Sequence, residues 1–277
     1  MHSGNMKRLL AKPWLLPDEA LIYFFNKVTS FIRLKTDSFG WAQAILYSRR
    51  VDEWLRYQVI AEQIRALDNP KGTIKSIVDV GGGPAYIMKY INPRDYYLCV
   101  LDINIESLKK SSSSFLDLVG GDACDLPFKD SSFDIATSVD SLEHVPDPKK
   151  AKYCAELKRV AKSWVIIHCP ADSADGQFQG TLCDTKFLQW YRRRFKSDES
   201  NTSQHLSSGL PKVEELKSLF PGARIMGSQN AEAWLKYMRY ERIPYLGFIT
   251  GLIYKFSLKK IDNTPPYHSQ YLIWEKI

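Results

Sequence analysis

Three glycines that follow a carboxylate stand out in the middle of the sequence as candidates for ligand binding. The β-branched run IVDV carries Asp79 and leads into the glycines, and a segment of helical pattern follows whose first turn suits Pro84. A strand that turns at once into a helix needs residues without a Cβ, and Gly81 and Gly83 would also let a ligand approach the backbone. The dinucleotide pattern G-x-G-x-x-G is incomplete, because Tyr86 holds the place of its third glycine. Asp79 would repel a pyrophosphate and suits a ligand that carries an amino group or a positive charge.

Two more aspartates follow later β-rich runs. Asp102 ends the run YYLCVLD, where a carboxylate can accept both hydroxyl groups of a ribose, and Asp122 follows the run FLDLVGG. Turn chemistry explains either aspartate alone equally well, since aspartate favours such positions. Because both stand at these spacings after the glycine turn, we interpret them as ligand-binding residues.

The stretch SVDSLEHVPDP contains a third group of residues with chemical potential. Asp140, Glu143 and His144 are spaced i, i+3, i+4, which places them on one face if the turn is helical, and we take them as the candidate catalytic residues. We expect His144, whose ordinary pKa lies near neutrality, to act as a general base or to position an acceptor. Two alternatives stay open: a Mg²⁺ or Mn²⁺ site completed by His168 or His205, and a plain helix cap formed by Glu143 and His144.

The elements that must position these residues alternate between strands and helices. Strands are expected near residues 76–81, 96–103, 115–123, 132–140 and 164–170. Helical patterns lie between them: Asn104 caps the segment IESLKKS, and DPKKAKYCAELKRVAKS carries its apolar residues on one face. Such alternation predicts a parallel sheet covered on both faces, with a ligand site at the carboxyl ends of the strands where the strand order reverses.

Four motifs stand in the order found in the class I S-adenosylmethionine-dependent methyltransferases: DVGGGPA, VLDI, GDACDLPFKDSSFD and SLEHVPDP. The sequence resembles this family over about residues 74–170, and most of all the subgroup that includes the quinone-biosynthesis methyltransferases. The resemblance implies an α/β fold with a doubly wound, mostly parallel seven-stranded sheet of the Rossmann-like methyltransferase type. N-terminal helices, helical lid insertions and an antiparallel edge hairpin formed by ARIMGSQ and SQYLIWEKI would complete it.

The resemblance also implies S-adenosyl-L-methionine as the cofactor and assigns residues to it. Asp79, Gly81 and Gly83 would form the turn under the methionine part. The remaining cofactor-binding residues would be Asp102 at the ribose, Asp122 with Ala123 at the adenine, and Ile103 and Asp140 beside them. Ala85 departs from the family, which commonly has glycine at this position.

The last of these motifs also resembles a metal site. Asp140, Glu143 and His144 match the E-x-x-E-H pattern of the ubiquinone O-methyltransferases and of the small-RNA terminal methyltransferases, with aspartate replacing the first glutamate. Because the aspartate side chain is shorter, we expect no metal here and keep Asp140, Glu143, His144 and His205 as candidate ligands only.

Composition narrows the remaining choices. The chain has 277 residues, a formal net charge of +7 and five widely spaced cysteines without a CxxC pair, so neither a disulfide framework nor a zinc knuckle is indicated and a cytoplasmic location is expected. The stretch Ile243–Tyr254 is too short to span a bilayer. The basic cluster YRRRFK is more typical of a solvated loop than of a phosphate-binding patch.

We expect a helical extension or lid over residues 1–72. One cofactor-binding domain would follow over residues 73–277, with insertions at about 171–208 and 230–265. The added segments would meet as a lid over a dry acceptor pocket. Residues 242–260 match an interfacial helix, although a buried lid helix explains the same pattern and is favoured.

The predicted function is transfer of a methyl group from S-adenosyl-L-methionine to an oxygen of a small or medium-sized acceptor, in secondary metabolism or glycan modification. C-methylation of a membrane quinone is the first alternative and RNA methylation the second, although no RNA-binding module is present. A binding protein without activity is a third class. We expect a small-molecule acceptor, no nucleic acid partner and at most peripheral membrane contact.

Overall fold

The computed structural model describes four stretches of the chain. The described residues are 51–68, 74–111, 115–243 and 250–276. The expected N-terminal extension is therefore represented by helix α4 (Val51–Asp68), and the first part of the apolar stretch that begins at Ile243 lies outside the described residues.

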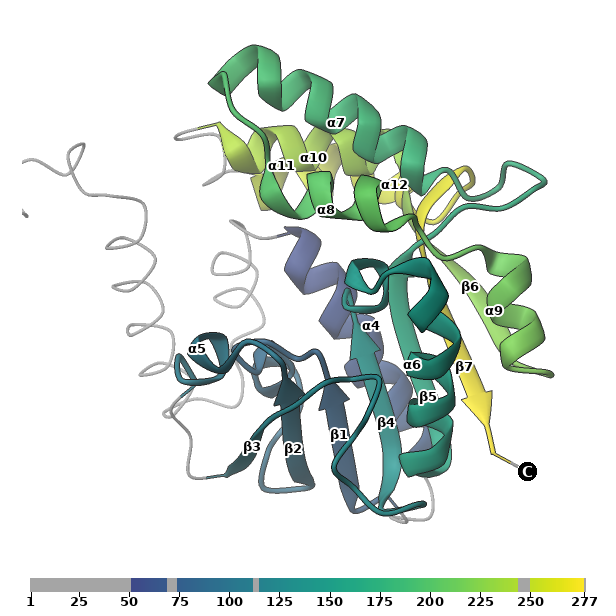
Figure 1. Ribbon diagram of the computed structural model, residues 1–277. Coiled ribbons are helices and arrows are strands. Elements are labelled where there is room, and N and C mark those ends of the chain that lie inside the picture. Colours follow the sequence, from purple (N-terminus) through teal and green to yellow (C-terminus); the bar gives the residue numbers. More distant parts are fainter. Residues whose placement is uncertain (1–50, 69–73, 112–114, 244–249, 277) are drawn as a thin grey trace, which may run out of the picture.

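Seven strands form one sheet in the order β3-β2-β1-β4-β5-β7-β6 (Figure 1). They are β1 (Ser76–Val80), β2 (Tyr97–Asp102), β3 (Leu116–Gly120), β4 (Phe133–Val139), β5 (Ala161–Pro170), β6 (Arg224–Asn230) and β7 (Tyr267–Glu275). Neighbouring strands are parallel except around β7, which runs antiparallel to both β5 and β6. The predicted doubly wound sheet and its terminal hairpin are confirmed. The strand order reverses between β1 and β4, so their carboxyl ends are where this topology places a ligand.

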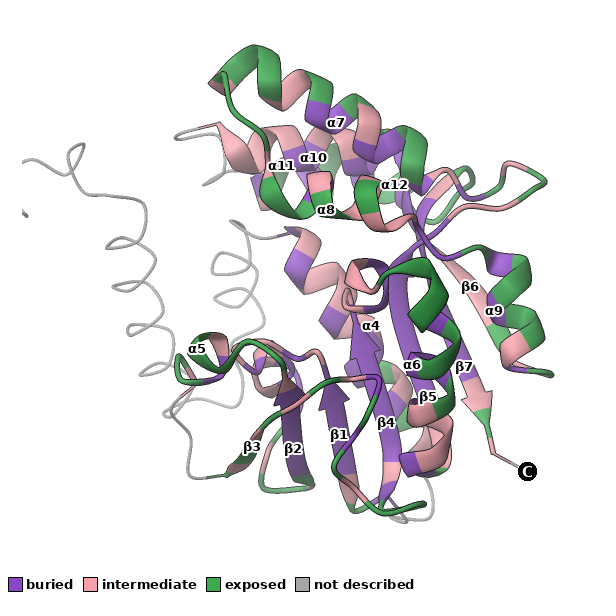
Figure 2. Cartoon of the chain, in the orientation of Figure 1, coloured by how far each residue is buried: buried purple, intermediate pink, exposed green. Residues whose placement is uncertain are grey.

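Helices cover both faces of the sheet. Successive side chains of β1 point to opposite faces, and because both sets are apolar, both faces are buried. Val78 and Val80 share a buried cluster with residues of α6 (Asp147–Val160) and α9 (Val213–Leu219). Ile77 faces the other way, into a cluster with residues of α4, of the 3₁₀ turn η3 (Tyr86–Lys89) and of α5 (Ile105–Leu108). The continuous apolar runs of the sequence are thus buried on both sides, as Figure 2 shows for the central strands.

Further helices gather above the carboxyl ends of the parallel strands (Figure 1). They are α7 (Gly180–Phe195), α8 (Ser200–Ser208), α10 (Ala231–Arg242), α11 (Thr250–Ile253), the π-helical turn η6 (Tyr254–Leu258) and α12 (Lys259–Asp262). Phe187, Trp234 and Tyr237 form the centre of their own buried cluster, which also includes Val51 at the start of α4. We call α7, α8 and α10–α12 the lid helices. They contain most of the two segments expected as insertions.

Two local expectations were wrong in detail. YRRRFK is not a loop: Tyr191–Phe195 form the last turn of α7, where the three arginines are exposed and Tyr191 packs near Phe187. The helix after the glycine turn is only the 3₁₀ turn η3, so Pro84 lies before it instead of in its first turn. Ala85 precedes that turn with φ 58°, a left-handed conformation that suits glycine better.

Asn104 caps α5 as predicted, because its side chain accepts a hydrogen bond from the Ser107 amide. In α6, acidic Asp147 stands in the first turn and basic residues in the last, which suits the helix dipole. Tyr153, Leu157 and Val160 lie on its buried face. Local sequence signals therefore account for both helices.

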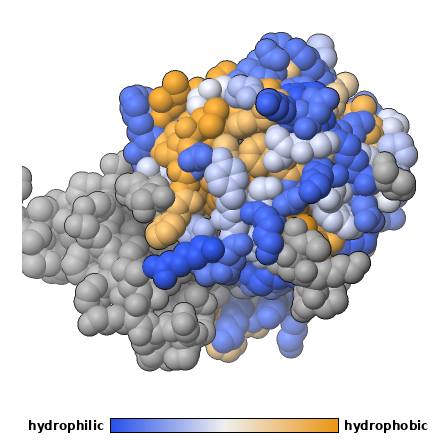
Figure 3. All heavy atoms as spheres, turned by 90° about the horizontal axis from the view of Figure 1, so that it is seen from below, coloured by the Kyte–Doolittle hydropathy of each residue, from blue (hydrophilic) through white to orange (hydrophobic). Residues whose placement is uncertain are grey.

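Among the residues that the structure describes, no helix is both long enough and apolar enough to cross a membrane. Figure 3 views the molecule from the end opposite the lid helices and shows hydrophilic residues interspersed with an apolar area.

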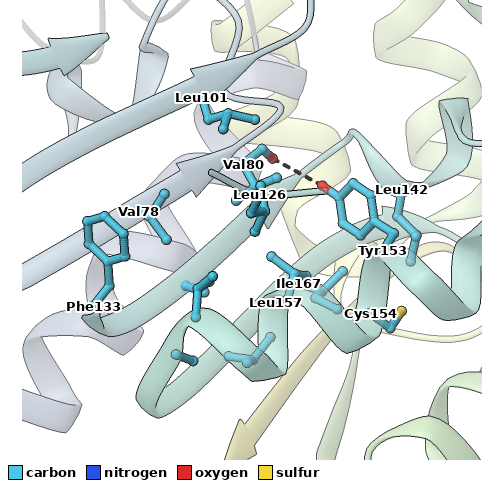
Figure 4. Close-up of a cluster of buried hydrophobic side chains, with 14 of the residues drawn as sticks. Val78, Val80, Leu101, Leu126, Phe133, Leu142, Tyr153, Cys154, Leu157 and Ile167 are labelled. Carbon is cyan, nitrogen blue, oxygen red and sulfur yellow. Dashed lines mark hydrogen bonds between the residues drawn. The ribbon is translucent and has the colours of Figure 1, made fainter. Parts of the chain in front are cut away.

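Tyr153 links α6 to the ends of two strands. Its buried hydroxyl lies 2.8 Å from Ser138 Oγ and 3.2 Å from both the Val80 carbonyl and Ser141 Oγ. Figure 4 shows the ring beside Leu142, with the hydroxyl directed at Val80. A single side chain thus fixes the ends of β1 and β4 relative to each other.

We predict that Tyr153→Phe lowers the free energy of unfolding by about 1–3 kcal/mol, because it leaves buried polar partners without a hydrogen bond. Urea denaturation measures the change. Tyr97→Phe is the matched control: its hydroxyl donates to Asp117 on the exposed side of the sheet, and about 0.5 kcal/mol or less is expected there. Equal losses in the two variants would contradict the role given to Tyr153.

Candidate active site

The glycine turn at the end of β1 has the conformation that its sequence suggested. Gly81 has φ +72°, and a Cβ at this position would lie 1.9 Å from Ser141 Oγ. Gly83 has φ +52°, and its amide donates a 2.8 Å hydrogen bond to Asp102 Oδ2. A side chain at Gly81 is therefore excluded unless Ser141 moves. The amides of Gly81 and Gly82 both donate to the Leu101 carbonyl, which ties the turn to the end of β2.

Asp102 stands at the end of β2, half-buried beside this turn. Its Oδ2 accepts from Gly83, and its Oδ1 accepts a 2.7 Å bond from the Asn104 amide. The next residue, Ile103, is 76% exposed. Asp122, beyond the end of the adjacent strand β3, is exposed and its Oδ1 accepts from the Cys124 amide at 2.8 Å. These residues and half-buried Ala123 line the carboxyl edge at β2 and β3, as a nucleoside would require.

Asp79 lies within β1 and is fully buried. Thr137 on β4 donates a 2.9 Å bond to its Oδ1, whereas its Oδ2 has no hydrogen-bond partner. Burial, which disfavours the ionised form, raises the pKa of Asp79 to about 7 despite the Thr137 hydrogen bond, and the charge of Asp102 adds to the rise. Among the residues that the structure describes, none donates a hydrogen bond to this second oxygen of Asp79.

Asp140 does not share a face with Glu143 and His144. The turn is a 3₁₀ helix, η4 (Leu142–His144), and Asp140 precedes it with φ +46°. Its Oδ1 lies 2.5 Å from His168 Nδ1, and its Oδ2 accepts from Arg56 Nη1 of α4. Although burial alone would raise it, the pKa of Asp140 is held well below its usual range by Arg56 and His168.

Glu143, His144 and His205 come together between η4 and the lid helix α8. One potential ligand atom from each lies within 4.8 Å of the others. Within the described part of the chain, both carboxylate oxygens of buried Glu143 and the His144 Nδ1 have no hydrogen-bond partner. Burial, with Asp140 adding to it, raises the pKa of Glu143 to about 8, and burial next to His205 lowers the pKa of His144. His168, the other candidate considered with this group, is bonded to Asp140 instead.

His205 is oriented from behind by residues that the sequence did not indicate. Its Nδ1 lies 2.9 Å from Oδ2 of buried Asp184 on α7, which leaves Nε2 3.9 Å from Glu143 Oε1. Asp184 Oδ1 is 3.2 Å from His268 Nε2 of β7, and that ring stacks on Trp234. Burial would lower the pKa of His205, but the Asp184 hydrogen bond and the Glu143 charge raise it to about 9.

Arg56, Asp184 and His268 were missed because nothing in the linear sequence marks them. Arg56 lies in a helix without any of the recognised motifs, and Asp184 and His268 stand far from every motif. Only the packing of α4, α7 and β7 around the carboxyl edge brings them to the site.

A glycine turn lies at the reversal between β1 and β4, an aspartate closes β2, and the single strand β7 runs antiparallel to its neighbours, as the resemblance to the S-adenosylmethionine-dependent methyltransferases implied. Residues 78–167 match the family model described as a methyltransferase domain.

Curated relatives of this domain are methyltransferases. The chain is 30% identical to tocopherol O-methyltransferase of Arabidopsis thaliana over 123 residues, 41% of this chain and 33% of that protein. It is 28% identical to demethylmenaquinone methyltransferase of Streptomyces avermitilis over 170 residues, 61% of each protein. The matches thus span less than two thirds of either relative.

The fold also recurs among solved structures. Phosphoethanolamine N-methyltransferase 2 of Haemonchus contortus, in complex with S-adenosyl-L-methionine, aligns with a TM-score of 0.51 at 16% identity. The alignment covers 79% of this chain and 52% of that one. At this identity the likeness concerns the fold alone.

The buried carboxyl of Asp79 leads to a prediction about stability. Its pKa is about 7 in the folded state, whereas the ordinary value of an aspartate in an unfolded chain is 3.8. The unfolded state therefore loses this proton first as pH rises from about 4 to 7, and stability falls over that window. Asp79→Asn removes this cost. We expect the gain in stability of Asp79→Asn over the parent protein to be about 1–3 kcal/mol larger at pH 8 than at pH 5.

Urea denaturation at both pH values measures this difference. Asp134→Asn is the control, because hydrogen bonds from Lys75 and Ser76 keep the pKa of Asp134 below its ordinary value and the carboxyl ionised at both pH values. Its effect should be the same at pH 5 and pH 8. An Asp79→Asn effect that is equally independent of pH would contradict the raised pKa.

Proposed function

We propose that this protein transfers the methyl group of S-adenosyl-L-methionine to an oxygen of a small or medium-sized acceptor. The observation that carries the proposal is the juxtaposition, at one sheet edge, of the glycine turn with its two acidic neighbours and the buried group of Glu143, His144 and His205. The first suits a cofactor with an amino acid and a nucleoside part, and the second suits a polar acceptor under the lid helices.

When bound, the cofactor supplies a methyl group already activated on a sulfonium. The chain therefore has to place the acceptor in line with that group and to exclude water, and it needs no covalent nucleophile. Asp102 offers its free lone pairs to the ribose hydroxyls, and the glycine turn lies beside the methionine part. The lid helices close the site on the side away from the sheet.

Oxygen is favoured as the acceptor atom because a hydroxyl must lose its proton on methylation. Glu143 has two unpartnered oxygens and His144 an unpartnered Nδ1, so either side chain can accept a hydrogen bond from that hydroxyl. The expected roles of Asp140, Glu143 and His144 thereby divide: Glu143 and His144 serve the acceptor, and Asp140 serves the cofactor end through Arg56 and His168. We expect these polar side chains to face the acceptor pocket, for which the sequence alone suggested a dry lining.

C-methylation of a membrane quinone remains the alternative, supported by the similarity to demethylmenaquinone methyltransferase. Leu252 and Phe256 of the lid helices are 50% and 73% exposed, whereas Tyr254 and Leu258 are buried among them. One side of this segment packs among the lid helices, and its exposed apolar side suits peripheral membrane contact.

RNA methylation has weaker support, since Arg192 of the basic turn is paired with Asp198. Incubation with labelled cofactor and sugar, phenol, quinone or RNA acceptors separates these possibilities.

Cofactor binding is the first test. Gly81→Val forces a side chain onto Ser141 and should abolish binding of S-adenosylhomocysteine in calorimetry, and Asp102→Ala should weaken it by tenfold or more, about 1.4 kcal/mol. Asp117→Ala, on the exposed face of β3, is the control and should bind as the parent does. Unchanged affinity in both folded site variants would remove the cofactor assignment.

The group of Glu143, His144 and His205 is also a candidate binding site for a divalent cation. Glu143, His144 and His205 fit one, because their free ligand atoms converge and Asp184 holds His205 from behind, as carboxylates do at metal-bound imidazoles. Asp140 is not available to it, since Arg56 and His168 occupy its oxygens. Bound there, a cation such as Mn²⁺ would polarise an acceptor hydroxyl and favour its ionised form.

Calorimetry with Mn²⁺ alone tests this candidate. We expect binding to the parent protein, its loss in His205→Ala and a tenfold or larger weakening in Asp184→Asn. Glu62→Gln, an exposed change on α4, is the control. No binding to the parent would exclude the cation. Full methyl transfer by His144→Ala, with and without a chelator, would leave Glu143 and His144 as cap residues only.

A further inference from the structure

A chain of hydrogen bonds runs from α4 through β6 and β7 to the lid helix α7. Gln229 of β6 donates from Nε2 to Asp52 Oδ1 at 2.9 Å, and its Oε1 accepts from the Ser269 hydroxyl at 2.9 Å. Ser269 Oγ lies 2.7 Å from His268 Nδ1, and His268 Nε2 lies 3.2 Å from Asp184 Oδ1. All but Asp52 are buried. The chain therefore ends at a carboxylate inside the lid.

The carboxylate of Asp52 fixes the direction of these bonds. It is paired with Arg56, with Nη2 2.7 Å from Oδ2, and an ionised carboxylate only accepts. The Gln229 amide must therefore turn its nitrogen to Asp52 and its oxygen to Ser269. The Ser269 hydroxyl gives its one hydrogen to that oxygen, so its Oγ is left to accept from the ring. His268 Nδ1 thus carries a proton.

The other ring nitrogen of His268 faces a carboxylate. A neutral ring with its proton on Nδ1 would turn the lone pair of Nε2 towards Asp184 Oδ1, and two acceptors would meet at 3.2 Å without a hydrogen. A second proton is needed in this contact, and it belongs to the imidazole because a carboxylate is the weaker base. The Trp234 ring stacks on the imidazole with 3.8 Å between centroids and 11° between planes, an arrangement that stabilises a cation.

The backbone of Gln229 gives independent support for a functional role. Its φ is +59°, a left-handed value that is uncommon for a residue with a side chain, although the residue is buried at the end of a strand. Such strain persists where the surroundings over-determine the conformation, and it is concentrated at functional sites. Here the carboxylate of Asp52 and the hydroxyl of Ser269 hold the amide from two sides.

We propose that Gln229 and Ser269 keep His268 doubly protonated. The charged ring then offsets the buried charge of Asp184 and fixes its Oδ1, and Oδ2 is left to accept from His205 Nδ1. His268 is thus a positioning residue, because it acts on His205 through Asp184. The inference rests on the proposed function, which places His205 beside the acceptor.

¹⁵N NMR of protein labelled at its five histidines distinguishes protonated from unprotonated ring nitrogens. At neutral pH, where a free imidazole is mostly neutral, we expect protons on both nitrogens of His268 in the parent. Nδ1 should lose its proton in Gln229→Met, where the released hydroxyl donates to it, and in Ser269→Ala, where it has no acceptor. Gln270→Met, a buried change at the next residue of β7, is the control and should keep both protons.

A second measurement follows His205. His268→Phe identifies the signals of that ring, keeps an aromatic side chain on Trp234 and removes the donor to Asp184. Because the carboxylate is then free to turn, the proton signal of His205 Nδ1 should be lost. It should remain in Ser269→Ala, where His268 still donates through Nε2. Circular dichroism checks that each variant is folded.

Each result supports or overturns the inference. One protonated nitrogen on His268 in the parent, or two in a folded Gln229→Met or Ser269→Ala, would overturn it. An unchanged His205 signal in His268→Phe would remove the positioning role. If one of the first two variants does not fold, the other carries that measurement, and His268→Leu replaces His268→Phe in the same case.

These measurements need no ligand and are therefore separate from the test of the proposed function. Calorimetry of the parent with S-adenosylhomocysteine provides that test. If the parent does not bind it, the proposed function fails and the positioning role of His268 fails with it, whatever the NMR signals show. If the parent binds it and His268 carries one proton, only the inference fails.

Discussion

The close approach of Gly81 and Ser141 is the constraint on which the rest of the site depends. β1 and β4 are parallel neighbours, and their chains leave in opposite directions at the reversal of the strand order. The segments after the two strands are thereby pressed against each other, and only a residue without a Cβ fits at Gly81. Tyr153 bonds to both segments from below and holds them in place. The positions of Asp140 and of the turn η4 follow from this contact.

The same edge carries buried carboxyls that cost stability. Asp79 and Glu143 have oxygens without hydrogen-bond partners, and burial raises the pKa of these groups to about 7 and about 8. A buried polar group without a partner destabilises a fold, so such groups are expected where a ligand completes them. Asp140 shows the opposite arrangement, with both oxygens bonded to Arg56 and His168. The same edge therefore holds one carboxylate with both oxygens hydrogen-bonded, Asp140, and two carboxyls with unbonded oxygens, Asp79 and Glu143.

The residues that orient His205 lie outside the family match. The match ends at residue 167, whereas Asp184, His205 and His268 belong to α7, α8 and β7. The chain of contacts from Glu143 through His205 and Asp184 to His268 joins the turn η4 to two lid helices and the antiparallel strand. The match thus includes the glycine turn, Asp102 and Glu143, whereas the residues that orient His205 come from segments that it does not cover.

The sequence by itself determined the sheet, its order of strands and helices and the cofactor edge. Those features depend on local signals: apolar runs such as the one before Asp79, a capping residue such as Asn104 and glycines at a forced turn. The sequence analysis predicted a loop for YRRRFK, which is the last turn of α7, because its charged residues obscured the apolar face of the helix. Arg56, the separation of Asp140 from Glu143, and the support of His205 by Asp184 were decided only by the tertiary structure. Arg56 and Asp140 are 84 positions apart in the sequence, Asp140 and His168 are 28 apart, and Asp184 and His205 are 21 apart. The separation of Asp140 from Glu143 also depends on φ +46° at Asp140. No local pattern encodes these features. The physical reason is that packing of whole helices on the sheet edge, and not neighbouring residues, sets which buried charges meet.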